Sequence, residues 1–404
     1  MKIYLVGGAV RDKLLGLPVK DRDWVVVGAT SKEMLEQGYK KVGVSFPVFI
    51  HPKTHEEYAL ARTERKVGPG YQGFEFHADP QVTLDEDLSR RDLTINAIAR
   101  SGNGRLVDPF HGARDLKHRF LRHVSPAFVE DPVRILRVAR IAAKLAPFNF
   151  QVVSETNKLM REMVLNGEIN ALVPERVWQE CEKALATNQP SYFFKVLRHC
   201  GALPVLFPEI DRLFGVPAAP EWHPEIDTGV HVMMALDAAA QLGFDPEVKF
   251  AVLMHDLGKG VTDKKQWPSH SGHNESGLPL VHAFCDRWHV PNCYRDLAIL
   301  VTRYHGLCHK IMSLRADTVV KTLQALDAFR KPDRFRQFLQ ACQADACGRM
   351  GHEHDPYPQA RIFNQAYELA AQVSAQQFID AGIKGMEIAR KLFEARVNAV
   401  KMLL

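Results

Sequence analysis

A pair of glycines and a pair of aspartates near the start of the chain have the types and spacing that nucleotidyl transfer needs. Gly7 and Gly8 follow a short apolar run, and without a Cβ their backbone can approach phosphate oxygens closely. Asp21 and Asp23 adjoin the apolar run Trp24–Val27, and strand alternation places both carboxylates on one face. Two such carboxylates can share Mg²⁺ ions that activate a hydroxyl and neutralise a leaving pyrophosphate. The order of these residues predicts a triphosphate-binding turn beside a two-metal site.

Arg11 extends this predicted site, because a guanidinium can fork onto two phosphate oxygens. Each feature alone also fits a simpler interpretation, a glycine turn in one case and a solvated acidic turn in the other. Their joint order on a strand–turn–helix–strand background favours nucleotidyl transfer. The G-x-G-x-x-G pattern of dinucleotide-binding proteins is absent from the sequence.

A second arginine-rich segment, 89–99, precedes another apolar pattern. Asp92 is predicted to cap an amphipathic helix there. Arg91 is predicted to reach a phosphate or a ribose hydroxyl. The alternative is ordinary capping with solvent-exposed arginines.

The segment 128–145 predicts a helix with Asp131 at its N-cap and Pro132 in its first turn. Three arginines then recur every three residues and share one broad face: Arg134, Arg137 and Arg140. The alternative is a basic solvent-exposed face. A carboxylate accepts from an exocyclic amine and a guanidinium donates to a ring nitrogen, and cytosine and adenine both offer that pair of groups. Asp131 and Arg134 are therefore predicted to admit C and A and to reject U and G, with the outer arginines on the triphosphate.

Histidines gather in a third region, from 227 to 310. The segment FAVLMHDLGKG predicts an apolar helix that ends in His255 and Asp256 and is stopped by Gly258. His231 and a later residue, His305, are predicted to complete an N/O ligand set for one divalent metal. Such a site activates water for phosphoester hydrolysis. The alternative for any single histidine is an ordinary core or surface residue.

The elements around these residues predict an α+β fold. Apolar runs predict strands at Ile3–Val6, Trp24–Val27, Phe46–Ile50 and Glu57–Arg62. The polar, glycine-containing segment 64–90 is predicted to be a long mobile loop, with a solvated linker as the alternative. Helical spacing begins near residue 128, and the Pro-rich segment 215–226 predicts a domain boundary.

Composition sets further limits on the kind of protein. The 404 residues carry a formal charge of +5, which permits a polyanionic partner without requiring one. Seven cysteines without a C-x-x-C pair fit a reducing cytoplasm. The N-terminal apolar run is too short for a signal peptide, and no segment approaches the length of a membrane span. We therefore expect a cytoplasmic protein without a membrane partner, either a monomer or a homodimer.

The first half of the chain resembles the class II CCA-adding enzymes, the tRNA nucleotidyltransferases of bacteria and eukaryotes. The motifs GGAVRD, DRD, RRDLTINA and EDPVRILRVAR stand in that family's order across roughly residues 1–225. The resemblance implies Mg²⁺ on Asp21 and Asp23, with Glu57 as the candidate third carboxylate. The residues that it implies for CTP or ATP binding are Gly8, Arg11, Arg91, Asp131, Arg134, Arg137 and Arg140. It also implies tRNA, held by its acceptor arm, as the partner.

The His-rich region resembles the HD metal-dependent phosphohydrolases, and the combination resembles the multifunctional CCA proteins. That resemblance implies phosphatase, 2′-nucleotidase and 2′,3′-cyclic phosphodiesterase activities, with His255 and Asp256 as catalytic residues. A distant aspartate completes the family's ligand set, and Asp296 and Asp345 are candidates, with His305 as a substitute. The ligand set is expected to hold a transition metal such as Ni²⁺, and N/O ligands of this type also suit Mn²⁺, Co²⁺ and Mg²⁺.

The predicted domains are a nucleotidyltransferase head at 1–125, a helical nucleobase-recognition and tRNA-binding region at 126–222, an HD domain at 227–330 and a helical tail at 331–404. The main alternative is a bacterial poly(A) polymerase, which shares the head motifs. A hydrolase whose head only holds RNA and a non-catalytic tRNA-binding protein are further alternatives.

Overall fold

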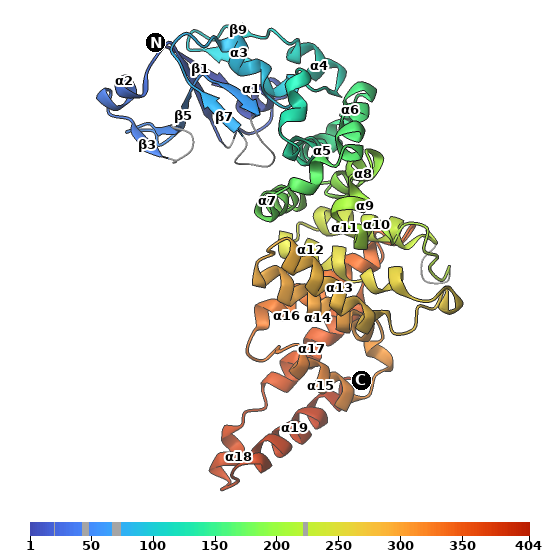
Figure 1. Cartoon of the computed structure of the whole chain (residues 1–404). Helices are drawn as coiled ribbons and strands as arrows, with labels where there is room; N and C mark the ends of the chain where they lie inside the picture. Colours follow the sequence, from blue (N-terminus) through green and yellow to red (C-terminus); the bar gives the residue numbers. More distant parts are fainter. Residues whose placement is uncertain (20, 43–47, 67–73, 221–224) are drawn as a thin grey trace. The chain divides into compact units, whose positions relative to one another are not determined.

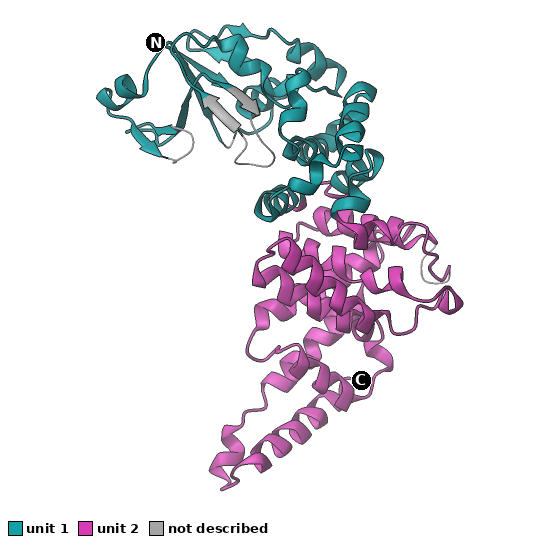
Figure 2. Ribbon diagram, viewed as in Figure 1, with its two compact units in different colours: residues 1–184, 192–206 teal, residues 185–191, 207–404 magenta. Residues whose placement is uncertain are grey.

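The structure is a computed structural model that describes residues 1–19, 21–42, 48–66, 74–220 and 225–404. These residues form two compact units, coloured separately in Figure 2. The first unit contains residues 1–184 and 192–206, and the second contains residues 185–191 and 207–404. The finer division into four domains stays a prediction.

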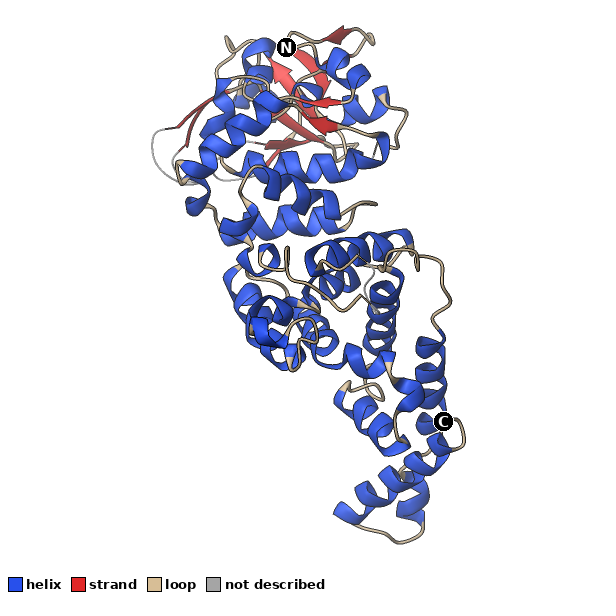
Figure 3. Ribbon diagram, turned by 90° about the vertical axis from the view of Figure 1, so that its right-hand side faces the viewer, coloured by secondary structure: helices blue, strands red, loops and turns tan. Residues whose placement is uncertain are grey.

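A mixed seven-stranded sheet is the framework of the first unit (Figure 3). Its strands in spatial order are β3 (Lys40–Val42), β4 (Val48–Ile50), β5 (Glu57–Leu60), β2 (Asp23–Val27), β1 (Lys2–Val6), β8 (Ala99–Ser101) and β9 (Leu106–Val107). Strands β2 and β5 are parallel, and the other neighbouring pairs are antiparallel. The predicted strands are therefore present, although residues 46 and 47 of the predicted Phe46–Ile50 strand lie outside the described residues.

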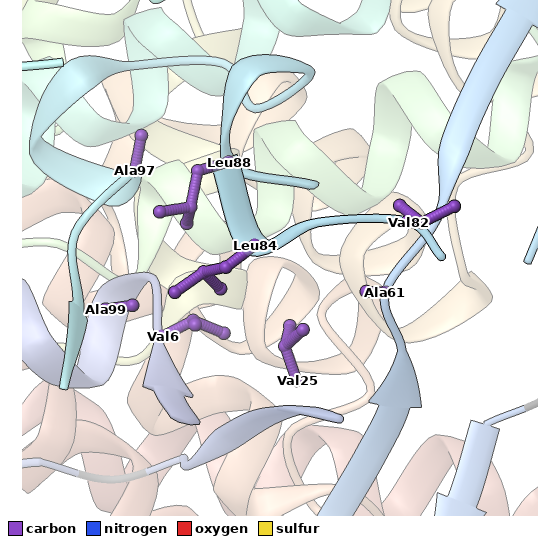
Figure 4. Close-up of a cluster of buried hydrophobic side chains, with 8 residues drawn as sticks. All are labelled: Val6, Val25, Ala61, Val82, Leu84, Leu88, Ala97 and Ala99. Atoms are coloured by element: carbon purple, nitrogen blue, oxygen red, sulfur yellow. The ribbon is translucent and has the colours of Figure 1, made fainter. Parts of the chain in front are cut away.

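The helices of the first unit cover this sheet and extend beyond it (Figure 1). They are α1 (Gly8–Leu14), α2 (Ser31–Glu36), α3 (Leu84–Ser89), α4 (Gly112–His118), α5 (Val133–Leu145), α6 (Ser154–Leu165), α7 (Pro174–Leu185), α8 (Ser191–His199) and α9 (Leu203–Leu206). On one face of the sheet, Val6 and Val25 pack against Leu84 and Leu88 of α3 (Figure 4). Burying these apolar side chains holds α3 on the sheet.

The prediction of a long loop over 64–90 is wrong in two places. Strands β6 (Thr63–Lys66) and β7 (Phe74–His77) pair antiparallel, and α3 follows them. A capping box starts α3, because the Thr83 hydroxyl accepts from the Glu86 N–H and the Glu86 carboxylate accepts from the Thr83 N–H. The predicted glycine-rich part, 67–73, lies outside the described residues.

The predicted amphipathic helix within 89–99 is also wrong. Only Thr94–Asn96 form a short 3₁₀ turn, and the chain then enters β8. Ile95 and Ile98 are buried in the core but do not lie along one face of a helix. The apolar pattern therefore indicates burial and not a helix.

The second unit is helical. Its helices are α10 (Pro208–Asp211), α11 (Thr228–Gln241), α12 (Pro246–Met254), α13 (His273–Arg287), α14 (Asn292–His309), α15 (Ala316–Ala325), α16 (Pro332–Cys347), α17 (Pro358–Ala371), α18 (Gln376–Asp380) and α19 (Met386–Lys401). Helix α12 is nearly all apolar and packs against α11, α14 and α16, as its composition requires. No helix in the described parts of the chain is both long and apolar enough to cross a membrane.

Gly258 does not stop α12, contrary to the prediction. The helix ends at Met254, and Gly258 lies in a 3₁₀ turn, Leu257–Val261. An added Cβ at Gly258 would lie 1.9 Å from the backbone oxygen of His273. Glycine is needed here because the turn and the start of α13 touch backbone to backbone.

Candidate functional site

The strand register places a second carboxylate beside Asp23. Asp23 lies opposite Glu57 in the parallel pair β2–β5, and Trp24 lies opposite Tyr58. The rings of Trp24 and Tyr58 stack with their centroids 5.5 Å apart, so alternation directs Asp23 and Glu57 to the other face of the sheet. Asp23 and Glu57 are exposed, as is Asp21, which lies two residues before β2. Exposed carboxylate oxygens of this kind suit Mg²⁺, so the residues present fit the metal that the sequence predicts.

The glycine turn brings Arg91 close to Asp23. Gly7 has a φ of +71°, a backbone conformation that favours glycine. An added Cβ at Gly7 would lie 3.1 Å from Nη1 of Arg91 and 3.9 Å from Oδ2 of Asp23. Gly8 begins α1 directly after this turn. A guanidinium, a carboxylate and a glycine backbone from three segments therefore share one small area.

Arg11, predicted to bind phosphate, is buried, and its guanidinium is hydrogen-bonded to other side chains. Its Nη1 donates to Oδ1 of Asn96 over 2.8 Å, and its Nε donates to Oδ1 of Asp12 over 2.9 Å. The other oxygen of Asp12 accepts from the ammonium of Lys144 on α5 over 2.7 Å. Binding a phosphate through Arg11 requires an exchange of these hydrogen bonds, and its nucleotide role stays a prediction.

Asp87 positions both arginines of the RRD segment. Its carboxylate is fully buried and pairs with Arg90 over 2.5 Å and with Arg91 over 3.2 Å. Burial raises the pKa of Asp87, but the two guanidinium groups outweigh it and hold the pKa below the usual range. Sequence reasoning gave Asp87 no role in the site. The only signal was the acidic run that includes it.

Asp92 does not cap a helix, in contrast to the prediction. Its Oδ1 accepts from the Leu93 N–H over 2.8 Å and from Nδ2 of Asn96 over 3.0 Å. Its Oδ2 lies 2.9 Å from Nε of Arg137 on α5. Burial raises the pKa of Asp92, yet Arg137 and Asn96 reverse that effect and lower it to about 2. Asp92 is therefore a carboxylate that ties the RRD segment to α5.

Arg134 is directed at the backbone. Helix α5 begins at Val133, one residue later than predicted, and Oδ1 of Asp131 accepts from the Val133 N–H over 3.1 Å. The guanidinium of Arg134 donates to the carbonyl oxygens of Ala127 and Arg90, the second over 2.6 Å. Asp131 and Arg134 thus lie one helical turn apart, as predicted, but Arg134 is mostly buried. Their role in base selection stays a prediction.

Helix α7 supplies partners that sequence reasoning missed. Arg176 forms a two-point ion pair with Asp131, at 2.8 and 3.3 Å, and Glu180 pairs with Arg140. Arg176 and Glu180 are four residues apart and therefore share one face of α7. That spacing was the only signal in the sequence, because the contacts join segments far apart along the chain.

A cluster of buried His and Asp side chains lies in the second unit. Three groups of possible ligand atoms each lie within 4.8 Å: His231, His255 and Asp256; His255, His305 and Asp345; Asp256, His273 and His305. Nε2 of His231 lies 2.8 Å from Oδ1 of Asp345, and Nε2 of His255 lies 3.6 Å from the same oxygen. The structure thus brings Asp345 to the predicted histidines. Asp296 instead lies 3.6 Å from Arg334.

The chemistry of this cluster fits a divalent metal. Burial lowers the pKa of His305, and His255 adds to that effect, so the pKa falls to about 3 and the imidazole is neutral. Burial raises the pKa of Asp256, but His255 and Lys259 outweigh it and hold the pKa well below the usual range. Both carboxylate oxygens of Asp256 are buried, and Oδ2 lies 2.7 Å from the ammonium of Lys259 and 3.2 Å from Nε2 of His255. Burial lowers the pKa of His255, but Asp256 and Asp345 outweigh it and raise the pKa to about 9. The imidazole of His255 must therefore lose a proton to bind a metal, because only the neutral ring ligates.

Two protein families match segments within residues 3–214 of the chain. The family described as the poly A polymerase head domain matches residues 3–122. The family described as the probable RNA and SrmB-binding site of polymerase A matches residues 149–214.

Two curated relatives match the whole chain. A multifunctional CCA protein from Thioalkalivibrio sulfidiphilus is 60% identical over 403 residues, which cover 100% of this chain and 98% of the relative. A multifunctional CCA protein from Alkalilimnicola ehrlichii is 57% identical with the same coverage.

Solved structures share the fold. A CCA-adding enzyme in apo form II superposes with a TM-score of 0.68 at 21% identity, covering 99% of this chain and 88% of that one. The Bacillus stearothermophilus CCA-adding enzyme in complex with CTP superposes with a TM-score of 0.65 at 23% identity, covering 98% of this chain and 88% of that one. The Thermotoga maritima CCA-adding enzyme complexed with tRNA superposes with a TM-score of 0.63 at 20% identity, covering 99% of this chain and 87% of that one. The α+β fold predicted from the sequence is confirmed.

Proposed function

The chain belongs to the multifunctional CCA protein family, and from that premise we propose that it adds C, C and A to tRNA 3′ ends, using CTP and ATP. The observation that carries this proposal is 57–60% identity to two multifunctional CCA proteins over the full length of the chain. Solved proteins of the same fold that are bound to tRNA and to CTP are consistent with these partners.

In the proposed transfer, the RNA 3′-oxygen bonds to the α-phosphorus, the bond from that phosphorus to the bridging oxygen breaks, and pyrophosphate leaves. Asp21 and Asp23 hold the metals, and the facing carboxylate of Glu57 is the third acid. Mg²⁺, when bound, supplies activation of the hydroxyl and neutralises the leaving charge. The backbone at Gly7 and Gly8 and the guanidinium of Arg91 receive the triphosphate.

Helix α5 provides the proposed selection of bases. Asp131 accepts from the exocyclic amine of C or A, and Arg176 holds that carboxylate in one orientation. Arg134 donates to the ring nitrogen, which requires it to give up a backbone carbonyl. Arg137 and Arg140 border the nucleotide on the same helix.

The His/Asp cluster supports a second candidate activity, phosphoester hydrolysis by an HD-type site. His231, His255, Asp256 and Asp345 would hold a transition metal such as Ni²⁺. A metal held there would supply activation of water for phosphoester hydrolysis, in which a bond from the water oxygen to phosphorus forms and the ester P–O bond breaks. Phosphatase, 2′-nucleotidase and 2′,3′-cyclic phosphodiesterase activities all follow this scheme.

The protein is proposed to be cytoplasmic and to meet the acceptor arm of tRNA through backbone phosphates. Such binding is salt-sensitive and tolerant of sequence. A monomer is proposed, with a homodimer as the alternative.

Incubation with tRNA trimmed to the discriminator base tests the main proposal. Extension by three nucleotides in the order C, C, A is the expected product. A long A tract would overturn the proposal and favour a poly(A) polymerase. The double variant D21A/D23A decides whether the predicted metal site performs the transfer, since CTP incorporation must then be lost.

A further inference from the structure

A hydrogen-bonded path leads from the His/Asp cluster to the beginning of helix α17. Oδ2 of Asp345 lies 2.8 Å from Nε2 of His309, the last residue of α14. Nδ1 of His309 lies 2.8 Å from the hydroxyl of Tyr357, the residue that precedes α17. This path therefore joins a carboxylate of α16 to the end of α14 and to the residue before α17.

The two oxygens of Asp345 face different groups. Oδ1 lies toward the cluster, 2.8 Å from His231 and 3.6 Å from His255. Oδ2 accepts a hydrogen bond from Nε2 of His309. This division leaves Asp345 one oxygen for a metal and fixes which one it is.

The direction of the hydrogen bond between His309 and Asp345 follows from the chemistry of the carboxylate. A carboxylate only accepts, so Nε2 of His309 donates to Asp345. Nδ1 of His309 faces the hydroxyl of Tyr357, so both ring nitrogens of His309 have a hydrogen-bonding partner. The Tyr357 hydroxyl also lies 3.5 Å from Sγ of Cys308, and the rings of His309 and Tyr357 pack with centroids 5.6 Å apart.

We propose that His309 and Tyr357 are positioning residues that hold Asp345 as a one-oxygen ligand of the HD-type metal site. His309 directs Oδ1 at the metal position by occupying Oδ2, and Tyr357 orients His309. Neither residue touches substrate or metal. Groups that orient metal ligands in this way contribute roughly 10- to 100-fold to metal affinity in other sites.

This inference rests on the proposed hydrolase site and is tested by metal binding, independently of turnover. The metal-free full-length protein is dialysed against Ni²⁺, and the affinity and the number of ions bound are measured. H309A is expected to bind Ni²⁺ roughly 10- to 100-fold more weakly than the unchanged protein. H309Q, which keeps an N–H donor near Nε2, is expected to recover part of the loss. Y357F removes only the hydroxyl and is expected to weaken binding by less than H309A does.

Matched controls separate positioning from a general loss of structure. H282A removes an exposed histidine of α13, and Y367F removes a hydroxyl from α17 without touching His309. Both are expected to bind Ni²⁺ like the unchanged protein, and circular dichroism checks that each variant is folded.

Ni²⁺ binding distinguishes a failure of the positioning role from a failure of the metal site. If H255A abolishes Ni²⁺ binding while H309A and Y357F leave it unchanged, the positioning role is overturned and the metal site stands. If H255A and D345N leave Ni²⁺ binding unchanged, the metal site itself is wrong, and the positioning role with it.

Discussion

The carboxylate of Asp92 lies 2.9 Å from Nε of Arg137, and this ion pair joins the RRD segment to helix α5. Asp92 also accepts from Asn96, which in turn accepts from Arg11. One hydrogen-bonded network therefore links the helix after the glycine turn to the helix that carries the predicted base-reading residues. Arg11 and Arg137, both predicted to bind nucleotide, are thus held by Asn96 and Asp92.

Stability at low pH should depend on Asp92. Its pKa is about 2 in the folded protein, against roughly 3.9 when unfolded, so the carboxylate stabilises the fold above about pH 4. That stabilisation, about 2–3 kcal/mol, is lost as the pH falls from about 4 to 2. Urea unfolding should show D92N less stable than the unchanged protein at pH 6, with the difference shrinking toward pH 2.

Asp317 offers a matched control for this experiment. Its pKa is also lowered to about 2, by a hydrogen bond from Arg315, but Arg315 is exposed and Asp317 is only partly buried at the start of α15. Solvent screens such a pair, so D317N should show little pH-dependent difference. A constant gap between D92N and the unchanged protein from pH 6 to pH 2 would contradict the role of the buried carboxylate.

Glu57 and Glu56 are adjacent acids that should behave differently. Glu57 faces the same side of the sheet as Asp23, whereas Glu56 accepts from the indole of Trp24 on the other side. E57Q should lower CTP incorporation roughly 10²- to 10³-fold, the scale at which a group that stabilises transition-state charge acts. E56Q should leave it within a few-fold. Equal rates for the two variants would remove Glu57 from the metal site.

Arg176 should influence which nucleotide is accepted. R176M removes the two-point ion pair that fixes Asp131. The expected result is weaker discrimination of CTP and ATP against UTP, with tRNA affinity largely retained. Single-nucleotide incorporation with each triphosphate measures the ratio. R161M, on the exposed face of α6, is the control, and the same ratio in R176M and R161M would argue against the orientation of Asp131 by Arg176.

Gly258 should tolerate no side chain. An added Cβ would lie 1.9 Å from the His273 backbone oxygen, so G258A must move the turn beside Asp256 or the start of α13. We expect a loss of about 1–3 kcal/mol in the free energy of unfolding and weaker Ni²⁺ binding. G260A is the control, because its nearest contacts are at an ordinary 3.4 Å. Unchanged thermal unfolding of G258A would show that the contact is not tight.

Asp345 and Asp296 should differ in hydrolysis. Only Asp345 approaches the histidines of the cluster, so D345N should abolish release of phosphate from a 2′-nucleotide and D296N should not. The measurement is phosphate release in the presence of Ni²⁺. A loss with D296N and none with D345N would reverse the assignment.

Much of the framework followed from local patterns. Four strands of the head, the α+β class and the helical character of the second unit were predicted, because strand alternation and helical spacing repeat within a few residues. The motifs also lie at the ends of regular elements. Gly7 follows β1, Asp23 begins β2 and His255 follows α12.

Sequence patterns gave wrong secondary structure where apolar residues are buried without forming a regular element. The apolar residues of 93–98 were predicted to form a helical stripe, but they fill the core around a short turn. The helix α3 was missed inside a predicted loop, although its capping box was visible in the sequence at Thr83 and Glu86.

The sequence by itself determined which chemical groups the protein carries and in what order, because residue type and local spacing are properties of the chain. Only the tertiary structure decided which of those groups meet: Asp345 with His231, Asp131 with Arg176, and Asp92 with Arg137. Each of these contacts joins segments that are distant along the chain. Their partners depend on how helices and strands pack, and no local pattern encodes that packing.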